Sequence, residues 1–274
     1  MSARQPFRSV TSRQNPLIGR FRDAARRSGR DDLVLIEGGT LVLDAARAGW
    51  TLVSVAVADD LLDGNAVRSL DSALEGPVDR LAVPRRVLSA LSPAKTPSGV
   101  VALARAPGRI ADPFGTDAPL VAIASGVQDP GNLGALARAA EAAGATGMLV
   151  CGVSADPFGW KALRGSMGSA FRLPLVRCPS AEEGIAAARA RGLRVLALTA
   201  RDGESLYDVD LRGPSALMVG GEGAGLPAQA VARADARVTI PMHPPVESLN
   251  VAAAAAIALY EAARQRSAPG ASQS

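Results

Sequence analysis

The first hundred residues alternate between short apolar runs and segments that are amphipathic or rich in turn-forming residues. Apolar runs of four to eight residues with turn residues at their ends predict strands. Four such runs occur, at residues 33–38, 52–58, 78–83 and 98–105. Residues 39–49 and 64–75 space their apolar positions at helical intervals and predict helices. The pattern therefore predicts a small α/β domain over residues 1–105.

The stretch APGRIADPFGTDAP (106–119) interrupts this alternation. It holds three prolines and two glycines and has no apolar periodicity. Such a composition predicts a linker, which we place at residues 106–118.

A more regular pattern follows the linker. Apolar strands are predicted at residues 119–125, 147–152, 194–200, 215–221 and 236–242. Helices are predicted at residues 131–143, 180–191 and 248–266. Continuous apolar strands separated by helices are typical of a parallel sheet that is covered on both faces. We therefore expect a second α/β domain at 119–266, followed by a polar tail at 267–274.

Positive charge is concentrated at the N-terminal end of the chain. Residues 1–30 contain eight arginines and one acid, whereas the whole chain of 274 residues carries a net charge of +4. This asymmetry indicates a polyanionic partner, although a basic tail that binds nothing has the same composition. Two cysteines are too few for a disulfide framework or a zinc site. We therefore expect no metal. Because neither a signal sequence nor a membrane span is evident, we also expect a cytoplasmic protein.

Three segments at the carboxyl ends of predicted strands carry most of the candidate chemistry. They are QDPGNLGALARAAEAAG (128–144), LMVGGEGAGLP (217–227) and IPMHPPVESLNVAAAAA (240–256). Ligands of open parallel sheets bind beyond such strand ends. The glycines of 220–225 do not fit the dinucleotide fingerprint, and neither a P-loop nor a G-x-S-x-G elbow is present. These absences disfavour a nicotinamide-dependent oxidoreductase, and the glycines indicate backbone close to a flat ligand.

Together the three segments resemble the motifs of the SpoU-like (TrmH-type) RNA 2′-O-ribose methyltransferases of the SPOUT superfamily. The first motif, N-x-G-x-x-x-R, is matched by Asn132, Gly134 and Arg138. The second, usually G-N-E-G-x-G-L, is matched at 220–226, except that Gly221 replaces the usual Asn. The third is matched by Ile240, Pro241, Met242, Ser248, Leu249 and Asn250.

The resemblance covers nearly the whole chain. SRQNPLI (12–18), LIEG (35–38) and TPSGVVAL (96–103) are similar to the ribosomal-protein-like substrate-binding domain of many members, and RGSMGS (164–169) is similar to the loop after the first motif. The resemblance implies a C-terminal SPOUT-type parallel-sheet domain with a deep trefoil knot, preceded by a smaller α/β substrate-binding domain. It also implies S-adenosylmethionine as the cofactor and a homodimer formed through the C-terminal domain.

The resemblance assigns site residues by position in this sequence. The catalytic set is Arg138, Asn132, Glu222, Ser248 and Asn250. The cofactor-binding set is Thr199, Gly220, Gly225, Ile240, Met242 and Leu249. The RNA-binding set is Arg8, Arg13, Asn15, Arg20, Arg30 and Arg164.

Several assigned residues also have a purely structural interpretation. The family often describes Arg138 as the base, but a guanidinium stays protonated. We therefore expect Arg138 to clamp the target phosphate and to stabilise developing charge. The alternative is an ion pair with Glu141, three residues further along the helix. Asn132 could be a helix N-cap, and Ser248 and Asn250 could cap the last helix.

Glu222 and His243 are two further titratable candidates. We expect Glu222 to orient the substrate, the alternative being a solvated turn residue. His243 is the only histidine and lies in the loop of the third motif, so it is a candidate general base. The family pattern does not require histidine there.

These observations predict an S-adenosylmethionine-dependent RNA 2′-O-ribose methyltransferase. Large-subunit rRNA is the favoured substrate, because the N-terminal domain resembles those of rRNA-modifying members; tRNA is the alternative. An antibiotic-resistance methyltransferase and a catalytically silent RNA-binding or assembly factor also remain open. The N-terminal arginines would hold RNA by its phosphates.

Overall fold

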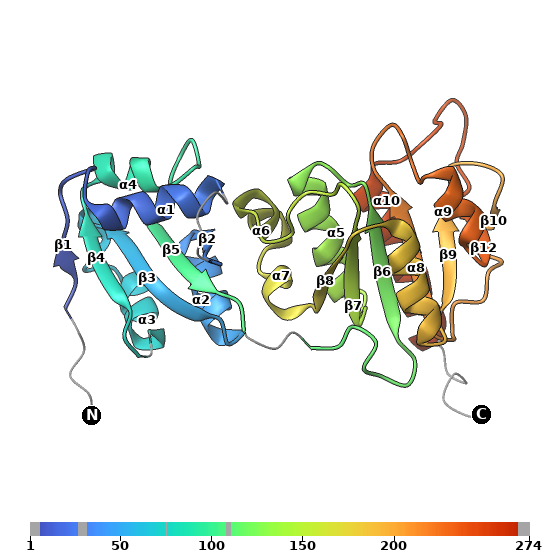
Figure 1. Ribbon diagram of the computed structural model, residues 1–274, viewed down its shortest axis with the longest axis horizontal. Coiled ribbons are helices and arrows are strands. Elements are labelled where there is room, and N and C mark those ends of the chain that lie inside the picture. The colour runs from blue at the N-terminus through green and yellow to red at the C-terminus, as the bar shows by residue number, and fades with distance from the viewer. Residues whose placement is uncertain (1–5, 27–31, 75, 108–110, 268–274) are drawn as a thin grey trace. The chain divides into compact units, whose positions relative to one another are not determined.

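The computed structural model describes residues 6–26, 32–74, 76–107 and 111–267. The chain divides into two compact units (Figure 1). The N-terminal unit contains residues 1–109 and 158–164, and the C-terminal unit contains residues 110–157 and 165–274. The first division falls inside the 106–118 segment.

Residues 158–164 are grouped differently from the sequence expectation, which placed them in the C-terminal domain. The ring of Phe158 lies edge-on to Trp50, with centroids 5.4 Å apart. Trp160 packs against the buried cluster that contains Ile18 and Phe21. Aromatic rings bury a large apolar area, and these contacts tie the segment to the N-terminal unit.

A five-stranded mixed sheet forms the centre of the N-terminal unit. Its order is β1 (Arg8–Ser9), β4 (Asp79–Val83), β3 (Thr51–Ala58), β5 (Val100–Arg105) and β2 (Val34–Glu37). The strands β1, β4 and β3 pair in parallel, and β5 runs antiparallel to both of its neighbours. All four strands predicted for this domain are present.

Helices cover this sheet in two pairs. Helix α1 (Pro16–Arg26) packs on α4 (Arg85–Leu91), and together they bury Ile18, Phe21 and Leu88 against the sheet. Helix α2 (Gly39–Arg47) packs on α3 (Asn65–Ala73) and on β2 and β5, and a 3₁₀ turn spans Asp59–Leu61. Helices α2 and α3 match the predicted helices at 39–49 and 64–75.

The C-terminal unit contains a seven-stranded sheet in which every pairing is parallel, as predicted. Its order is β10 (Glu204–Ser205), β12 (Ala236–Thr239), β9 (Arg194–Leu198), β11 (Ser215–Gly220), β6 (Leu120–Ser125), β7 (Gly147–Cys151) and β8 (Leu175–Cys178). The chain fills β6, β7 and β8 towards one edge and then returns to β9 beyond β11. Strand order therefore changes direction beside β6, which is where α/β sheets bind ligands.

Helices cover both faces of this sheet. Helices α8 (Ala181–Ala190) and α9 (Ala228–Arg233) pack together on one face, over Ile123, Leu149 and Met218. Helices α5 (Pro130–Ala142) and α10 (Val251–Ser267) pack on each other and on β6, β7 and β11. Two short helices, α6 (Trp160–Ser166) and α7 (Ser169–Arg172), lie between β7 and β8 in the chain.

The last helix is fixed to the amino-terminal edge of the sheet by one arginine. The Arg266 guanidinium donates to the carbonyls of Leu211 at 2.9 Å, Ala118 at 2.7 Å and Gly213 at 2.5 Å. Charge-assisted hydrogen bonds to several carbonyls satisfy a half-buried cation. Arg266 thus joins the end of α10 to the loops that precede β6 and β11.

Within the described residues, no helix is both long and apolar enough to cross a membrane. The same residues contain no cluster of three or more His, Cys, Asp or Glu side chains suited to a metal ion. The trefoil knot implied by the resemblance stays a prediction.

Candidate active site

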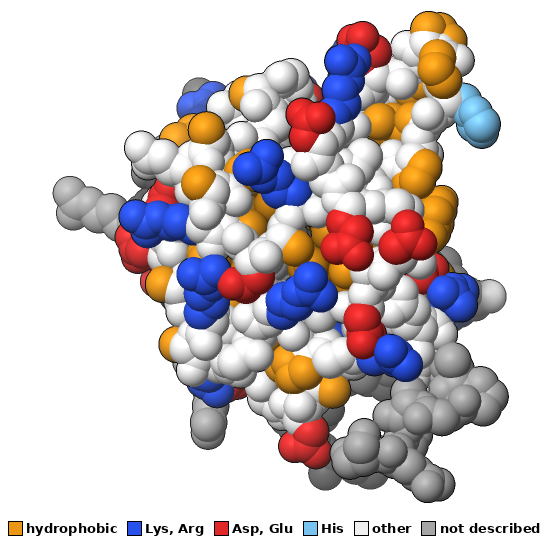
Figure 2. Space-filling view, turned by 90° about the vertical axis from the view of Figure 1, so that its right-hand side faces the viewer, with side chains coloured by type: hydrophobic (Ala, Val, Ile, Leu, Met, Phe, Trp, Pro, Cys, Tyr) orange, Lys and Arg blue, Asp and Glu red, His pale blue; other side chains and the backbone are white. Residues whose placement is uncertain are grey.

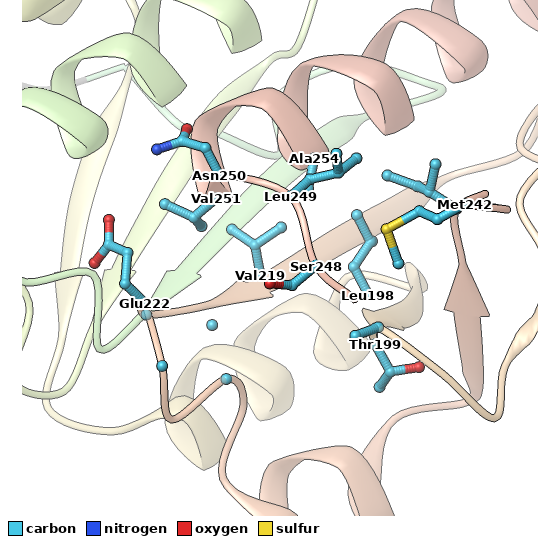
Figure 3. Close-up of a pocket in the computed structure, with 16 residues that line it drawn as sticks. Leu198, Thr199, Val219, Glu222, Met242, Ser248, Leu249, Asn250, Val251 and Ala254 are labelled. Atoms are coloured by element: carbon cyan, nitrogen blue, oxygen red, sulfur yellow. The ribbon is translucent and has the colours of Figure 1, made fainter. Parts of the chain in front are cut away.

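A pocket of the C-terminal unit, with a volume of about 450 Å³, lies where β9, β11 and β12 end (Figure 3). The segment that enters α10 closes it from the other side. All six predicted cofactor residues line this pocket: Thr199, Gly220, Gly225, Ile240, Met242 and Leu249. A volume of this size and a largely aliphatic lining suit a small organic cofactor.

Five apolar lining residues were not predicted: Leu198, Ala200, Val219, Val251 and Ala254. Leu198, Ala200 and Val219 each adjoin a predicted cofactor residue at the end of β9 or β11, whereas Val251 and Ala254 lie on the first turns of α10. Their nearness to the predicted motifs was the available signal. Sequence reasoning missed them because apolar residues have the same composition in the core and at the wall of a pocket.

The glycine-rich loop after β11 owes its shape to very close backbone packing. A Cβ atom on Gly220 would lie 2.1 Å from the carbonyl carbon of Gly225. Gly221 and Gly225 form an isolated bridge, and Gly225 adopts a positive φ of 65°. Only glycine satisfies both the contact and the backbone angle.

Gly221, the one departure from the family motif, is also required by packing. A Cβ at this position would stand 2.0 Å from the carbonyl oxygen of Gly126. An asparagine therefore cannot occupy this backbone without displacing the loop that follows β6.

Three predicted catalytic residues are joined by hydrogen bonds at the edge of the pocket. The Nδ2 of Asn132 donates to Oε1 of Glu222, and the Nδ2 of Asn250 donates to Oδ1 of Asn132 at 3.0 Å. Figure 3 shows Glu222 and Asn250 on the same side of the pocket. One residue from each motif thus meets the others, although they are far apart in the sequence.

Asn132 is not the N-cap of its helix, so that alternative is wrong. Asp129 caps α5, because its Oδ1 accepts from the backbone N–H of Asn132 at 2.8 Å. Pro130 then begins the helix, a position where its missing N–H costs nothing. The Asn132 side chain is therefore free to bond Glu222 and Asn250.

Asn250 has both of the functions considered for it. Its Oδ1 accepts from the backbone N–H groups of Ala252 at 3.0 Å and Ala253 at 3.3 Å, which caps α10. Its amide nitrogen is then turned towards Asn132. Ser248 is exposed and lines the pocket, and the observed cap is Asn250.

Arg138 is exposed on α5 and is not among the residues that line the pocket. The alternative ion pair with Glu141 is wrong, because Glu141 accepts from Arg172 at 2.6 and 2.8 Å. This bidentate contact from Arg172 holds the pKa of Glu141 below its ordinary value. Within the described part of the chain, the Arg138 guanidinium has no partner and is available to an external anion.

His243 is exposed and is not among the residues lining the pocket. Figure 2 shows the imidazole standing out at the surface. The geometry gives no support to His243 as a general base.

The predicted RNA-binding residues of the described chain lie mostly on the N-terminal unit. Arg8 is on β1, Arg20 on α1 and Arg164 on α6. Arg13 donates to the Arg86 carbonyl at 3.0 and 2.7 Å, and Asn15 accepts from the backbone N–H of Leu17 at 3.0 Å. Arg13 and Asn15 thus also hold the start of α1, while Arg30 lies outside the described residues. In contrast, the face drawn in Figure 2 mixes positive and negative side chains.

Comparisons with known proteins agree with this geometry. The SpoU rRNA Methylase family model matches residues 119–260, and the model of the thiostrepton-resistance methylase N terminus matches residues 7–112. An uncharacterized tRNA/rRNA methyltransferase of Synechocystis sp. is 32% identical over 94% of both chains. The 23S rRNA (guanosine(2553)-2′-O)-methyltransferase RlmP of Bacillus subtilis is 32% identical over 82% of this chain and 86% of its own.

Solved structures give the same result. An S-adenosylmethionine-bound rRNA methyltransferase from Sinorhizobium meliloti is 31% identical, with a TM-score of 0.81 over 94% of this chain and 98% of that one. An RNA 2′-O ribose methyltransferase is 34% identical, with a TM-score of 0.80 over 94% of this chain and 99% of the other. The predicted family and fold class are confirmed: this chain belongs to the SpoU rRNA methylase family.

Proposed function

We propose that the protein transfers a methyl group from S-adenosylmethionine to a ribose 2′-hydroxyl of large-subunit rRNA. The observation that carries this proposal is the meeting of Asn132, Glu222 and Asn250 at the edge of the 450 Å³ pocket. It is supported by family membership and by relatives that are named as 23S rRNA 2′-O-methyltransferases.

The pocket residues fit S-adenosylmethionine. The close approach of Gly220 to Gly225 leaves bare backbone at the pocket wall, where a purine ring can lie. Ile240, Met242 and Leu249 offer apolar contact to such a ring, and Thr199 lines the same pocket. When bound, the cofactor supplies an electrophilic methyl group.

The residues of the chain would position the attacking ribose. The Nδ2 of Asn132 donates to Oε1 of Glu222, which leaves Oε2 to accept a hydrogen bond from the ribose 2′-hydroxyl. That hydrogen bond would aim the 2′-oxygen at the methyl group. Ser248 lines the pocket nearby and offers a second polar contact. Arg138 would clamp a phosphate of the target nucleotide and offset charge that develops during transfer.

The N-terminal unit would hold the RNA away from the reacting atoms. Arg8 and Arg20 lie on its β1 and α1, and within the described residues their guanidinium groups have no protein partner. Contacts of this kind act on phosphates, so affinity would be salt-dependent and largely independent of sequence.

The protein would act as a cytoplasmic homodimer. Helix α10 exposes Ala253, Ile257 and Tyr260 along one stripe, with Ile257 and Tyr260 37% and 54% exposed. Residues at this spacing lie on one face of a helix. An apolar stripe on a helix that packs beside α5 suits contact with the same helix of a second copy.

Transfer of radiolabel from methyl-labelled S-adenosylmethionine to separate unmodified rRNA and tRNA pools tests this function. We expect label on ribose of the rRNA pool, and a loss of about 100-fold or more in Arg138→Ala with cofactor affinity unchanged, because Arg138 is not among the pocket residues. Label confined to tRNA would change the substrate. Cofactor binding without transfer to either pool would point to another RNA or to a missing assembly context, and the absence of both binding and transfer would favour an RNA-binding factor.

A further inference from the structure

A second hollow, of about 270 Å³, adjoins the cofactor pocket at the glycine-rich loop. The two share Gly221, Glu222 and Gly225. The end of β6, the loop before α5 and the loop after β7 contribute Ser125, Gly126, Gln128 and Val153, and the segment between β11 and α9 adds Ala224 and Pro227. Glu222 therefore borders both cavities.

The backbone around this hollow is fixed by hydrogen bonds between its two loops. Ser154 Oγ accepts from the backbone N–H of Val127 at 3.2 Å and donates to the carbonyl of Cys151 at 2.7 Å. Ala155 N–H donates to the Val127 carbonyl at 2.8 Å. Val127 itself is fully buried. The hollow is thus preformed, and each of the two loops places one exposed side chain in its lining, Gln128 and Val153.

Neither of these two side chains is buried in the core of the unit. Val153 is 80% exposed, the largest exposure among the exposed large hydrophobic residues of the described chain. Gln128 is exposed, and within the described residues its amide has no hydrogen-bond partner. A single exposed valine needs no explanation, but here it shares a hollow with a free amide and a catalytic carboxylate.

The chemistry of the lining favours a neutral, flat, hydrogen-bonding group over a phosphate. No Lys or Arg belongs to the described lining, and its one ionisable side chain is the Glu222 carboxylate. An anion would therefore be repelled. The edge of a nucleobase offers donors and acceptors that a glutamine amide can match, and its face suits contact with an aliphatic side chain.

We propose that this hollow receives the base of the nucleotide that is methylated, with Gln128 reading the base edge and Val153 contacting its face. This assignment rests on the proposed RNA 2′-O-methyltransferase function. A nucleotide whose base occupies the hollow would have its ribose beside Glu222, at the boundary with the cofactor pocket. Gln128 and Val153 would then determine specificity, while Asn132, Glu222 and Asn250 serve the reaction itself.

The test compares Gln128→Ala, Gln128→Glu and Val153→Ser with Gln229→Ala, an exposed glutamine on α9. The methylated nucleotide is first mapped in the labelled RNA by nuclease digestion and mass spectrometry. Synthetic fragments with each of the four bases at that position then give kcat/KM for every variant, and cofactor affinity and thermal unfolding are measured in parallel.

We expect Gln128→Ala to lower kcat/KM about 10-fold for the native base and to reduce the difference between bases. Gln128→Glu, which keeps the acceptor and loses the donor, should change the preferred base. Val153→Ser should raise KM for all four fragments, with cofactor affinity and unfolding as in Gln229→Ala.

The proposal is overturned if Gln128→Ala keeps the rates and base preference of Gln229→Ala, or if its only effect is weaker cofactor binding. Wild-type protein that methylates no RNA would instead count against the proposed function. These two failures are therefore distinguishable.

Discussion

At the scale of single residues, the site depends on the direction of three side-chain amide contacts. Asn250 must turn its oxygen to the N–H groups that begin α10, so its nitrogen faces Asn132. Asn132 must then accept with its oxygen and donate with its nitrogen, which meets Glu222. The capping of α10 thereby determines that Asn132 presents its donor, and not its acceptor, to Glu222.

Asn132→Asp removes the donor and places a second carboxylate against Glu222. Like charges at hydrogen-bond distance repel, so Glu222 should turn away from the ribose. We expect kcat to fall about 100-fold with little change in cofactor affinity, measured by single-turnover methyl transfer and by calorimetry. Asn132→Ala should be less damaging than Asn132→Asp, and Asn65→Asp on α3 is the control. Equal activity of Asn132→Asp and wild type would refute this account of the amide contacts.

At the scale of elements, the sequence was most informative where the apolar pattern was continuous. All predicted strands of the C-terminal sheet are present, because buried parallel strands are apolar throughout. Helices α1, α4, α6, α7 and α9 were not predicted: α1 carries three arginines and reads as a basic segment, and the other four are short. The cap of α5 was left open because Asp129 and Asn132 are both good capping residues, and only the fold shows that Asp129 caps the helix.

Helices α5 and α7 are linked by the contact of Arg172 with Glu141, and this link predicts a pH dependence. Because the pKa of Glu141 is lowered in the folded chain, its stabilising effect is complete above its ordinary pKa of 4.5 and is lost as the pH falls through the lowered value. Glu141→Gln should therefore reduce the free energy of unfolding at pH 7 by about 0.5–1 kcal/mol, since both side chains are partly exposed.

Urea denaturation at pH 7 and at successively lower pH checks this prediction. The difference between Glu141→Gln and wild type should shrink below about pH 4.5. Glu204→Gln, an exposed carboxylate on β10, should show no such difference at any pH. A constant difference for Glu141→Gln would mean that packing, rather than charge, is lost.

At the scale of the whole molecule, the sequence predicted two α/β domains and a site at strand ends. Their exact membership needed the structure: residues 158–164 join the N-terminal unit through Phe158 and Trp160, a contact that no local pattern encodes. Spacing alone likewise cannot predict a knot, since knotted chains are rare. The oligomeric state also belongs to this scale. The proposed dimer depends on exposed residues of α10, Ile257 and Tyr260, which do not pack in the core.

Replacement of Ile257 or Tyr260 by Asp tests that dimer. A charge placed in an apolar contact between copies would be desolvated without a partner, so light scattering after gel filtration should change from two chains per particle to one. Tyr207→Asp is the matched control, since Tyr207 is 59% exposed and lies outside α10. Thermal unfolding should be nearly unchanged for a protomer that folds alone. A wild-type particle of one chain, or a dimer that survives both substitutions, would place the contact elsewhere or remove it.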